Sequence, residues 1–151
     1  MTIENNNPNR TERHNSRRYA VQAMYQWQMA GAPISEIEHD FVTQHIEKKL
    51  DMDYFKELIH NIPAHKDEID NAIKPFLHRS MSDIDPVELA VLRLATYELL
   101  KRAEIPYRVI INEALKLTKE FGSVEGYKFI NGILDRIARA NREVEVNMPK
   151  E

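Results

Sequence analysis

Four arginines lie close together near the start of the chain, and their spacing is the first pattern that could do chemistry. Residues 10–18 hold these arginines with a single acid and carry a net charge of +3, in a chain of overall net charge −3: Arg10, Glu12, Arg13, Arg17 and Arg18. Guanidinium groups bind phosphate oxygens through paired hydrogen bonds. The cluster therefore indicates either a solvated basic chain end or a site for an anion.

The position of the cluster at a predicted helix start gives an anion site a physical basis, while a solvated basic chain end stays equally open. Asn15 or Ser16 is a suitable N-cap for a helix whose apolar residues recur with helical spacing. Arg17 and Arg18 would then lie in the first turn, where the helix dipole disfavours positive side chains. A phosphate would reverse that penalty, because it would meet free backbone amides and several guanidinium groups together.

A second basic and aromatic pattern occurs near the other end of the chain. Tyr127 precedes Lys128, and Arg136 and Arg139 follow on the same segment. Aromatic rings beside basic groups suit single-stranded RNA, which proteins hold by base stacking and by contacts to the phosphates. Phe129 also lies on the apolar stripe of this segment, which is typical of a core residue.

The patterns that mark enzymes and metal sites are absent from the sequence. There is no cysteine, the six histidines form no H-E-x-x-H pair, and the four glycines form no phosphate-binding loop. Asp51 and Asp53 lack the glycine and the distal glutamate of a calcium loop. We therefore expect no catalytic residue, no metal and no cofactor.

The elements that would position the basic residues are all helical. Apolar residues recur with helical spacing in about seven segments, and no alternating run predicts a strand. The strongest start signal is Asp85, which can cap a helix with Pro86 in its first position and Glu88 completing a capping box. Gly122 suits a left-handed helix end, whereas Gly132 inside a helix is expected to mark a close approach by another helix.

The distribution of polar residues divides the chain into a start, a helical body and a tail. We expect a flexible extension over residues 1–12, one all-α domain over 13–142 and a flexible tail over 143–151. No apolar run is long enough to cross a bilayer, and the start lacks the apolar stretch of a signal peptide. The sequence therefore predicts a cytoplasmic protein without a membrane segment.

Four segments of the chain form a recognisable set: A-V-Q-A-M-Y-Q-W-Q, A-V-L-R-L-A-T-Y-E-L, I-P-Y-R-V-I-I-N-E-A-L-K-L-T-K-E-F-G and K-F-I-N-G-I-L-D. Their order and spacing closely resemble the NusB family of bacterial transcription antitermination factors, over residues 13 to about 140. The resemblance implies two packed helical subdomains, at about residues 13–75 and 76–142, and no catalysis. It also implies binding to boxA RNA of ribosomal RNA leaders together with the small-subunit ribosomal protein NusE, in a complex that supports processive transcription by RNA polymerase.

The resemblance further implies which residues form the two binding surfaces. The RNA-binding surface would comprise eight residues from two segments: Arg13, His14, Arg17, Arg18, Glu125, Tyr127, Lys128 and Phe129. The surface for NusE would include Tyr25 and Glu88.

Two other functions stay open at this point. Certain ribosomal RNA methyltransferases carry a NusB-like N-terminal domain, although 151 residues leave no room for the methyltransferase domain itself. The chain could also be a helical protein-binding module without RNA specificity, which would bind NusE and show no preference for boxA.

Overall fold

The chain folds into helices alone over the residues that the structure describes. In the computed structural model these are residues 3–148, except for the side chains of residues 3–9 and Val124. Eight α-helices and three short helical turns occur in that range, and no strand does. The predicted all-α fold is confirmed. The helices form two compact units, Met1–Ala64 and His65–Glu151, so the division falls before the expected one near residue 75.

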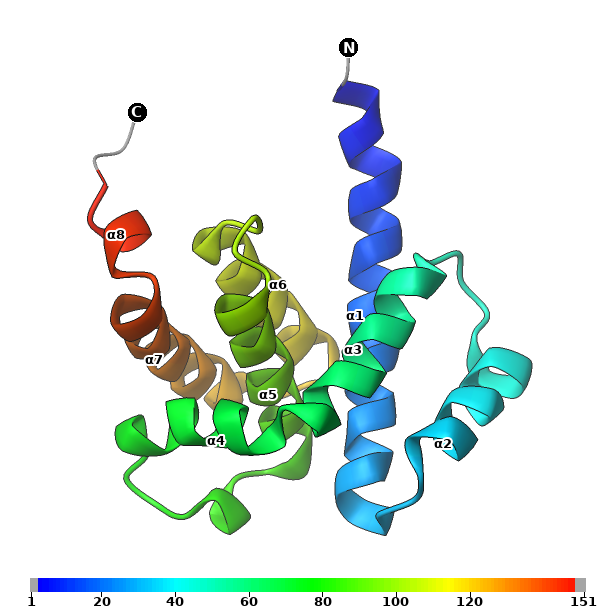
Figure 1. Cartoon of the computed structure of the whole chain (residues 1–151), viewed down its shortest axis with the longest axis horizontal. Coiled ribbons are helices and arrows are strands. Elements are labelled where there is room, and N and C mark those ends of the chain that lie inside the picture. The colour runs from blue at the N-terminus through cyan, green and yellow to red at the C-terminus, as the bar shows by residue number, and fades with distance from the viewer. Residues whose placement is uncertain (1–2, 149–151) are drawn as a thin grey trace. The chain divides into compact units, whose positions relative to one another are not determined.

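The first unit is built on one long helix, α1 (Ile3–Ala30), and α3 (Met52–Ala64) packs against it (Figure 1). Its elements are α1 (Ile3–Ala30), α2 (Ile34–Asp40), the π-helical turn η1 (Phe41–His45) and α3 (Met52–Ala64). Ala20, Ala23 and Met24 are fully buried, as the helical spacing predicted, whereas Trp27 is only half-buried. The five apolar residues predicted to face inward on α3 are all buried: Tyr54, Phe55, Leu58, Ile59 and Ile62.

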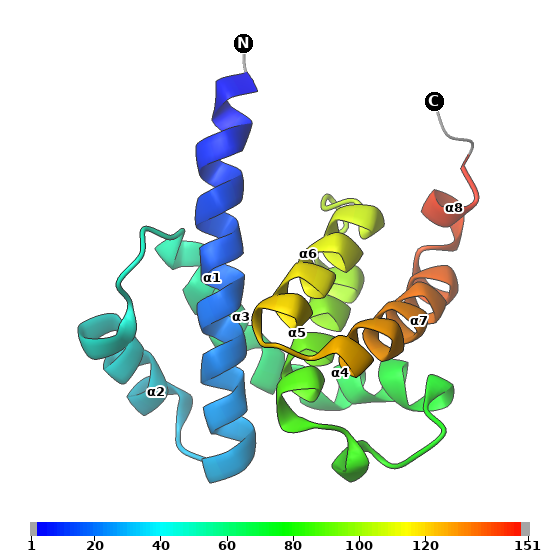
Figure 2. The same ribbon diagram turned by 180° about the vertical axis from the view of Figure 1, so that it is seen from behind.

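The second unit surrounds one central helix, as the rear view in Figure 2 also shows. Its elements are α4 (Lys66–Ile73), the 3₁₀ turns η2 (Lys74–Phe76) and η3 (Met81–Asp83), α5 (Pro86–Lys101), α6 (Tyr107–Glu120), α7 (Val124–Asn141) and α8 (Glu143–Val146). Every residue of α5 from Leu89 to Leu99 is buried, because α4, α6 and α7 all pack against it. Asp85 caps α5 through Val87 N and Glu88 N, as predicted.

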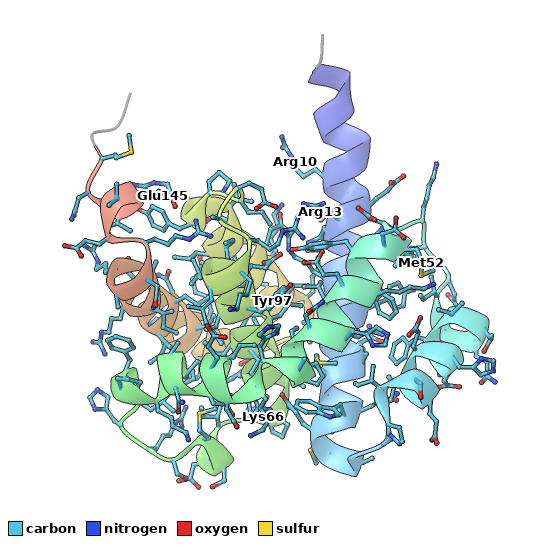
Figure 3. The ribbon with its side chains drawn as sticks, in the orientation of Figure 1. Arg10, Arg13, Met52, Lys66, Tyr97 and Glu145 are labelled. Carbon is cyan, nitrogen blue, oxygen red and sulfur yellow. The ribbon has the colours of Figure 1, made fainter. Side chains whose placement is uncertain are left out.

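A buried ion pair fastens α4 to α5. Arg93 donates from Nε to Asp70 Oδ1 and from Nη2 to Asp70 Oδ2, at 3.0 Å each. Lys66, labelled in Figure 3, adds its Nζ at 3.3 Å from Asp70 Oδ2. Two charges can share a protein interior only with such close and multiple hydrogen bonds, so the pair fixes how α4 sits on α5.

The chain after α7 is held in place by one buried arginine. Arg142 donates to the carbonyl oxygens of four residues at and after the end of α5, at 2.9–3.2 Å: Glu98, Leu99, Arg102 and Ile105. Its Nη1 also donates to Glu145 Oε1 at 2.7 Å, and Glu145 Oε2 accepts from Tyr107 N at the start of α6. Residues 143–146, expected to belong to a flexible tail, therefore form α8. Residues 149–151 lie outside the described part of the chain.

The first helix begins much earlier than predicted. α1 starts at Ile3 and has no N-cap at Asn15 or Ser16, so most of the expected extension over residues 1–12 is helical and only residues 1 and 2 lie outside the description. Ser16 is fully buried, and its Oγ donates to Asp51 O at 2.7 Å and accepts from Asp51 N at 2.9 Å. Asn15 Nδ2 donates to Lys49 O at 2.7 Å. These polar side chains bind the loop before α3 rather than the end of their own helix.

Candidate nucleic-acid interface

The cationic side chains of α1 differ in how accessible they are. Arg10 is exposed, and Figure 3 shows it near Arg13 on the same helix. Arg13 places its Cζ 4.1 Å from the centre of the Tyr54 ring and its Nη2 3.8 Å from Asp51 Oδ2, with 34% of the side chain exposed. His14 and Arg18 are half-buried. Part of the predicted basic surface is therefore open to an anion, with Arg13 held over an aromatic ring.

Arg17 does not have the accessible position that the sequence predicted. It is 3% exposed, and its Cζ lies 5.5 Å from the centre of the Tyr54 ring. Because α1 starts at Ile3, Arg17 and Arg18 lie in the helix interior, and the argument from the helix dipole does not apply to them. The structure thus assigns Arg17 to the packing of α1 on α3.

The start of α7 is set by a chain of hydrogen bonds to α5. Ser123 Oγ donates to Glu88 Oε2 at 2.6 Å and accepts from Gly126 N at 3.0 Å, which caps α7. A Cβ on Gly126 would collide with the side chains of Glu88 and Ser123. Glu88 was expected to complete the capping box of α5, but its Oε2 instead positions the turn before α7.

The close approach predicted at Gly132 is wrong. A Cβ built on Gly132 meets no atom within 4 Å, and the residue is exposed. The glycine that a close approach requires is Gly126, which faces α5. Gly122 has a φ of 85°, so the predicted left-handed end of α6 is confirmed.

Tyr127 and Lys128 line a basic hollow between the end of α6 and the start of α7. The hollow measures about 470 Å³ and is also lined by Lys119, Gly122 and Ser123. Lys119 Nζ lies 4.9 Å from the centre of the Tyr127 ring. An aromatic ring with two lysines and no carboxylate can stack an unpaired base and attract its phosphates.

Glu125 and Phe129 face a different hollow on the other side of α7. It measures about 500 Å³, and its lining holds one cation among several carboxylates: Arg79, Asp83, Asp85, Glu88, Glu125, Gly126 and Phe129. Arg79 Cζ lies 4.5 Å from the centre of the half-buried Phe129 ring. The carboxylates make this hollow unsuitable for phosphate, and they suit amino groups of bases or of a protein partner.

The two residues expected at a protein surface belong to different units. Tyr25, on α1, is 39% exposed, and Met29 one turn later is 59% exposed. Glu88, at the start of α5, is half-buried and bonded to Ser123. Tyr25 therefore has the exposure that a contact residue needs, and Glu88 combines any contact with a structural role.

Two basic residues of these hollows were missed by sequence reasoning. Lys119 reaches Tyr127 only because Gly122 turns the chain back between α6 and α7. Arg79 lies in the loop between η2 and η3, and it meets Phe129 from fifty residues away in sequence. The spacing of Lys119 and Tyr127 around a predicted helix end could have suggested the first pair, and no local signal marks the second.

The described residues contain neither a metal-binding cluster nor a membrane-spanning helix. No group of three or more histidine, cysteine, aspartate or glutamate side chains in this part of the chain could hold a metal ion. Within residues 3–148, no helix combines the length and the apolar character needed to cross a bilayer.

The sequence is similar to a set of curated proteins that share one name. A transcription antitermination protein NusB from Pseudomonas savastanoi pv. phaseolicola is 50% identical over 139 residues, which cover 92% of this chain and 84% of the relative. The protein of the same name from Shewanella halifaxensis is 47% identical over 132 residues, covering 87% of this chain and 98% of the relative.

The fold is similar to solved structures of proteins with that name. A crystal structure of antitermination factors NusB and NusE in complex with double-stranded RNA matches with a TM-score of 0.75 and 26% identity, over 84% of this chain and 96% of the other. NusB from T. maritima matches with a TM-score of 0.72 and 30% identity, over 89% and 97%. The profile of the NusB family matches residues 14–139, and the chain therefore belongs to the NusB family.

Proposed function

We propose that this chain is an RNA-binding transcription antitermination factor, which binds boxA RNA together with the ribosomal protein NusE and so supports processive transcription by RNA polymerase. Its relatives at about 50% identity carry the name of that activity, and a structural neighbour was solved with NusE and RNA. The proposal assigns no catalytic step and no cofactor to the chain. Because such a factor acts on nascent RNA, we place it in the cytoplasm.

The observation that carries the proposal is the hollow formed by Lys119, Tyr127 and Lys128. It presents an aromatic ring and two positive charges without a carboxylate in its lining. That combination holds single-stranded RNA through base stacking and phosphate contacts. Arg13, partly exposed over the Tyr54 ring, offers a similar pairing of cation and aromatic ring in the first unit.

The exposure of each side chain determines whether we expect it to touch RNA. Arg13, Tyr127 and Lys128 are the side chains that we expect to touch RNA directly, with His14, Arg18, Glu125 and Phe129 as further contacts. Arg17 is too deeply buried to reach a phosphate without local opening, so we expect it to act by holding Arg13 and Tyr54 in place.

The test is a titration of the full chain with boxA RNA and with a scrambled RNA of equal length. We expect boxA to be preferred, and NusE to increase that preference. Arg13→Gln and Lys128→Gln should each weaken boxA binding by about tenfold, since a hydrogen bond to a charged group contributes about 1.5 kcal/mol or more. Lys66→Gln, an exposed lysine paired with Asp70 on α4, is the control and should bind as the wild type does.

Two results would contradict the proposal in different ways. Equal affinity for boxA and scrambled RNA, with NusE binding intact, would make the chain a protein-binding adaptor without RNA specificity. A preference for boxA that survives both Arg13→Gln and Lys128→Gln would place the RNA on another surface of the chain.

A further inference from the structure

The C-terminal part of α1 and the loop after it carry no charged side chain. Residues 19–35 contain no aspartate, glutamate, lysine, arginine or histidine, although charged residues make up 30% of the chain. One side of this part of α1 is nevertheless exposed, and we call it the uncharged face: Tyr25, Gln26, Met29 and Ala30. An exposed surface that lacks charge and holds an aromatic ring and a methionine is typical of the centre of a protein–protein interface.

Met29 places an oxidisable sulfur on the uncharged face. It is 59% exposed and follows Tyr25, which is 39% exposed, by one helical turn. Side chains four residues apart on a helix are neighbours, so the thioether and the ring belong to the same patch. Met24 on the same helix is fully buried. A dissolved oxidant can therefore reach Met29 and not Met24.

Hydrogen peroxide oxidises a methionine by transferring one oxygen atom to it. A lone pair of the sulfur attacks one peroxide oxygen, the O–O bond breaks, and the other oxygen leaves as water. The sulfur is oxidised to the sulfoxide while the peroxide is reduced. The product has a polar S=O group in place of an apolar thioether, and burying that group against a partner without a hydrogen bond costs about tenfold or more in affinity.

We propose that Met29 is a sulfoxidation site that regulates protein binding on the uncharged face. The reduced thioether packs against NusE, and the sulfoxide weakens that contact until a methionine sulfoxide reductase restores the thioether. RNA does not suit this face, because RNA affinity depends on cations that neutralise phosphates and the face has none. The inference rests on the proposed function, which assigns NusE as the partner, and it adds regulation of that contact.

The first measurement is a map of oxidation by peptide mass spectrometry after the full chain is treated with hydrogen peroxide. Met148, which follows α8 in the second unit and is 62% exposed, is the matched control outside the uncharged face. We expect Met29 and Met148 to be oxidised while Met24 stays reduced. Bound NusE should protect Met29 and leave the oxidation of Met148 unchanged.

The second measurement compares the NusE affinity of treated and untreated protein, with the peroxide removed before untreated NusE is added. Treated wild type should bind NusE about tenfold more weakly, and methionine sulfoxide reductase should restore the affinity. Met29→Leu should lose nothing on treatment because leucine has no sulfur, whereas Met148→Leu should lose as much as the wild type does. Each variant is compared with its own untreated sample, so any effect of the leucine itself cancels.

The outcomes separate the modification site from the proposed function. If the untreated chain binds no NusE, both proposals are overturned. If the untreated chain binds NusE but treatment weakens Met29→Leu as much as the wild type, or weakens neither although Met29 is oxidised, the modification site is overturned and the proposed function stands. The same conclusion follows if NusE leaves Met29 unprotected. It also follows if boxA affinity without NusE, or the melting temperature, falls on treatment together with the NusE affinity, since oxidation would then act on the whole fold.

Discussion

At the scale of single residues, Arg13 and Arg17 have the same chemistry in different environments. Both guanidinium groups face the Tyr54 ring, but Arg17 is 3% exposed whereas 34% of the Arg13 side chain is exposed. A phosphate can reach Arg13 without disturbing the packing of α1 on α3. Their substitution should therefore separate folding from binding.

We predict that Arg17→Glu unfolds the first unit more easily, whereas Arg13→Gln mainly lowers RNA affinity. The substitution would bury a carboxylate where the fold packs a guanidinium group, which costs about 3 kcal/mol or more. Arg13→Gln loses only a partly exposed contact, which costs about 1 kcal/mol or less. Urea unfolding followed by circular dichroism measures both. Equal stability of the two variants would show that Arg17 is not a packing residue.

The two glycines inside α7 should respond in opposite ways to alanine. Gly132→Ala adds a methyl group in open space and should stabilise the protein by about 1 kcal/mol, the difference in helix propensity. Gly126→Ala must displace Glu88 and Ser123, so it gains the same propensity but loses a cap and a hydrogen bond worth about 1 kcal/mol each. We expect a net loss of about 1 kcal/mol. If thermal unfolding showed both variants to be stabilised, the contact between Glu88 and the start of α7 would not hold in solution.

At the scale of elements, the apolar pattern predicted most of the helices. It failed where contacts between residues distant in sequence determine the start of a helix or the exposure of a side chain. The start and the capping of α5 follow from Asp85 and Pro86, which act within a few residues of each other. The start of α1 could not be predicted in this way, because Ser16 bonds Asp51 in the distant loop before α3 rather than capping a helix. Accessibility at the candidate site depends on tertiary packing in the same manner, which is why Arg17 was misplaced and Arg79 was missed.

The short helix α8 depends on Glu145, and its stability should therefore depend on pH. Burial raises the pKa of Glu145, but the hydrogen bond from Tyr107 N and the pairing with Arg142 outweigh it, so the pKa lies below the ordinary value. A carboxyl with a lowered folded pKa stabilises the fold above its unfolded pKa of about 4.3, and it loses this contribution as the pH falls through the folded pKa.

We predict that Glu145→Gln lowers stability near neutral pH and that this difference from the wild type disappears under acidic conditions. The variant keeps the size of the side chain but removes the charge that Arg142 and the start of α6 bind. Unfolding by urea at a series of pH values from 7 downward to about 3 covers the window in which the carboxyl titrates. A stability difference that stays constant over this range would show that the charge of Glu145 does not contribute.

At the scale of the whole molecule, local charge matters more than net charge. The chain carries a net charge of −3, yet the hollow lined by Lys119, Tyr127 and Lys128 has no carboxylate in its lining. Elsewhere cations are compensated by acids, as in the pairs Lys101–Glu68, Lys116–Glu113 and Arg139–Asp135. A polyanion is therefore attracted to particular surfaces rather than to the protein as a whole.

This distribution predicts a salt dependence that specific substitutions reduce. Single-stranded RNA releases counterions as its phosphates are neutralised, so the logarithm of the binding constant falls linearly with the logarithm of salt concentration, by about 0.7 for each phosphate contacted. Lys128→Gln should lower the magnitude of this slope by about 0.7. Lys116→Gln removes an equal charge from an exposed residue paired with Glu113, and should leave the slope unchanged. If both variants shifted the slope equally, the RNA would respond to the net charge of the protein, and the assignment of phosphate contacts to Lys128 would be wrong.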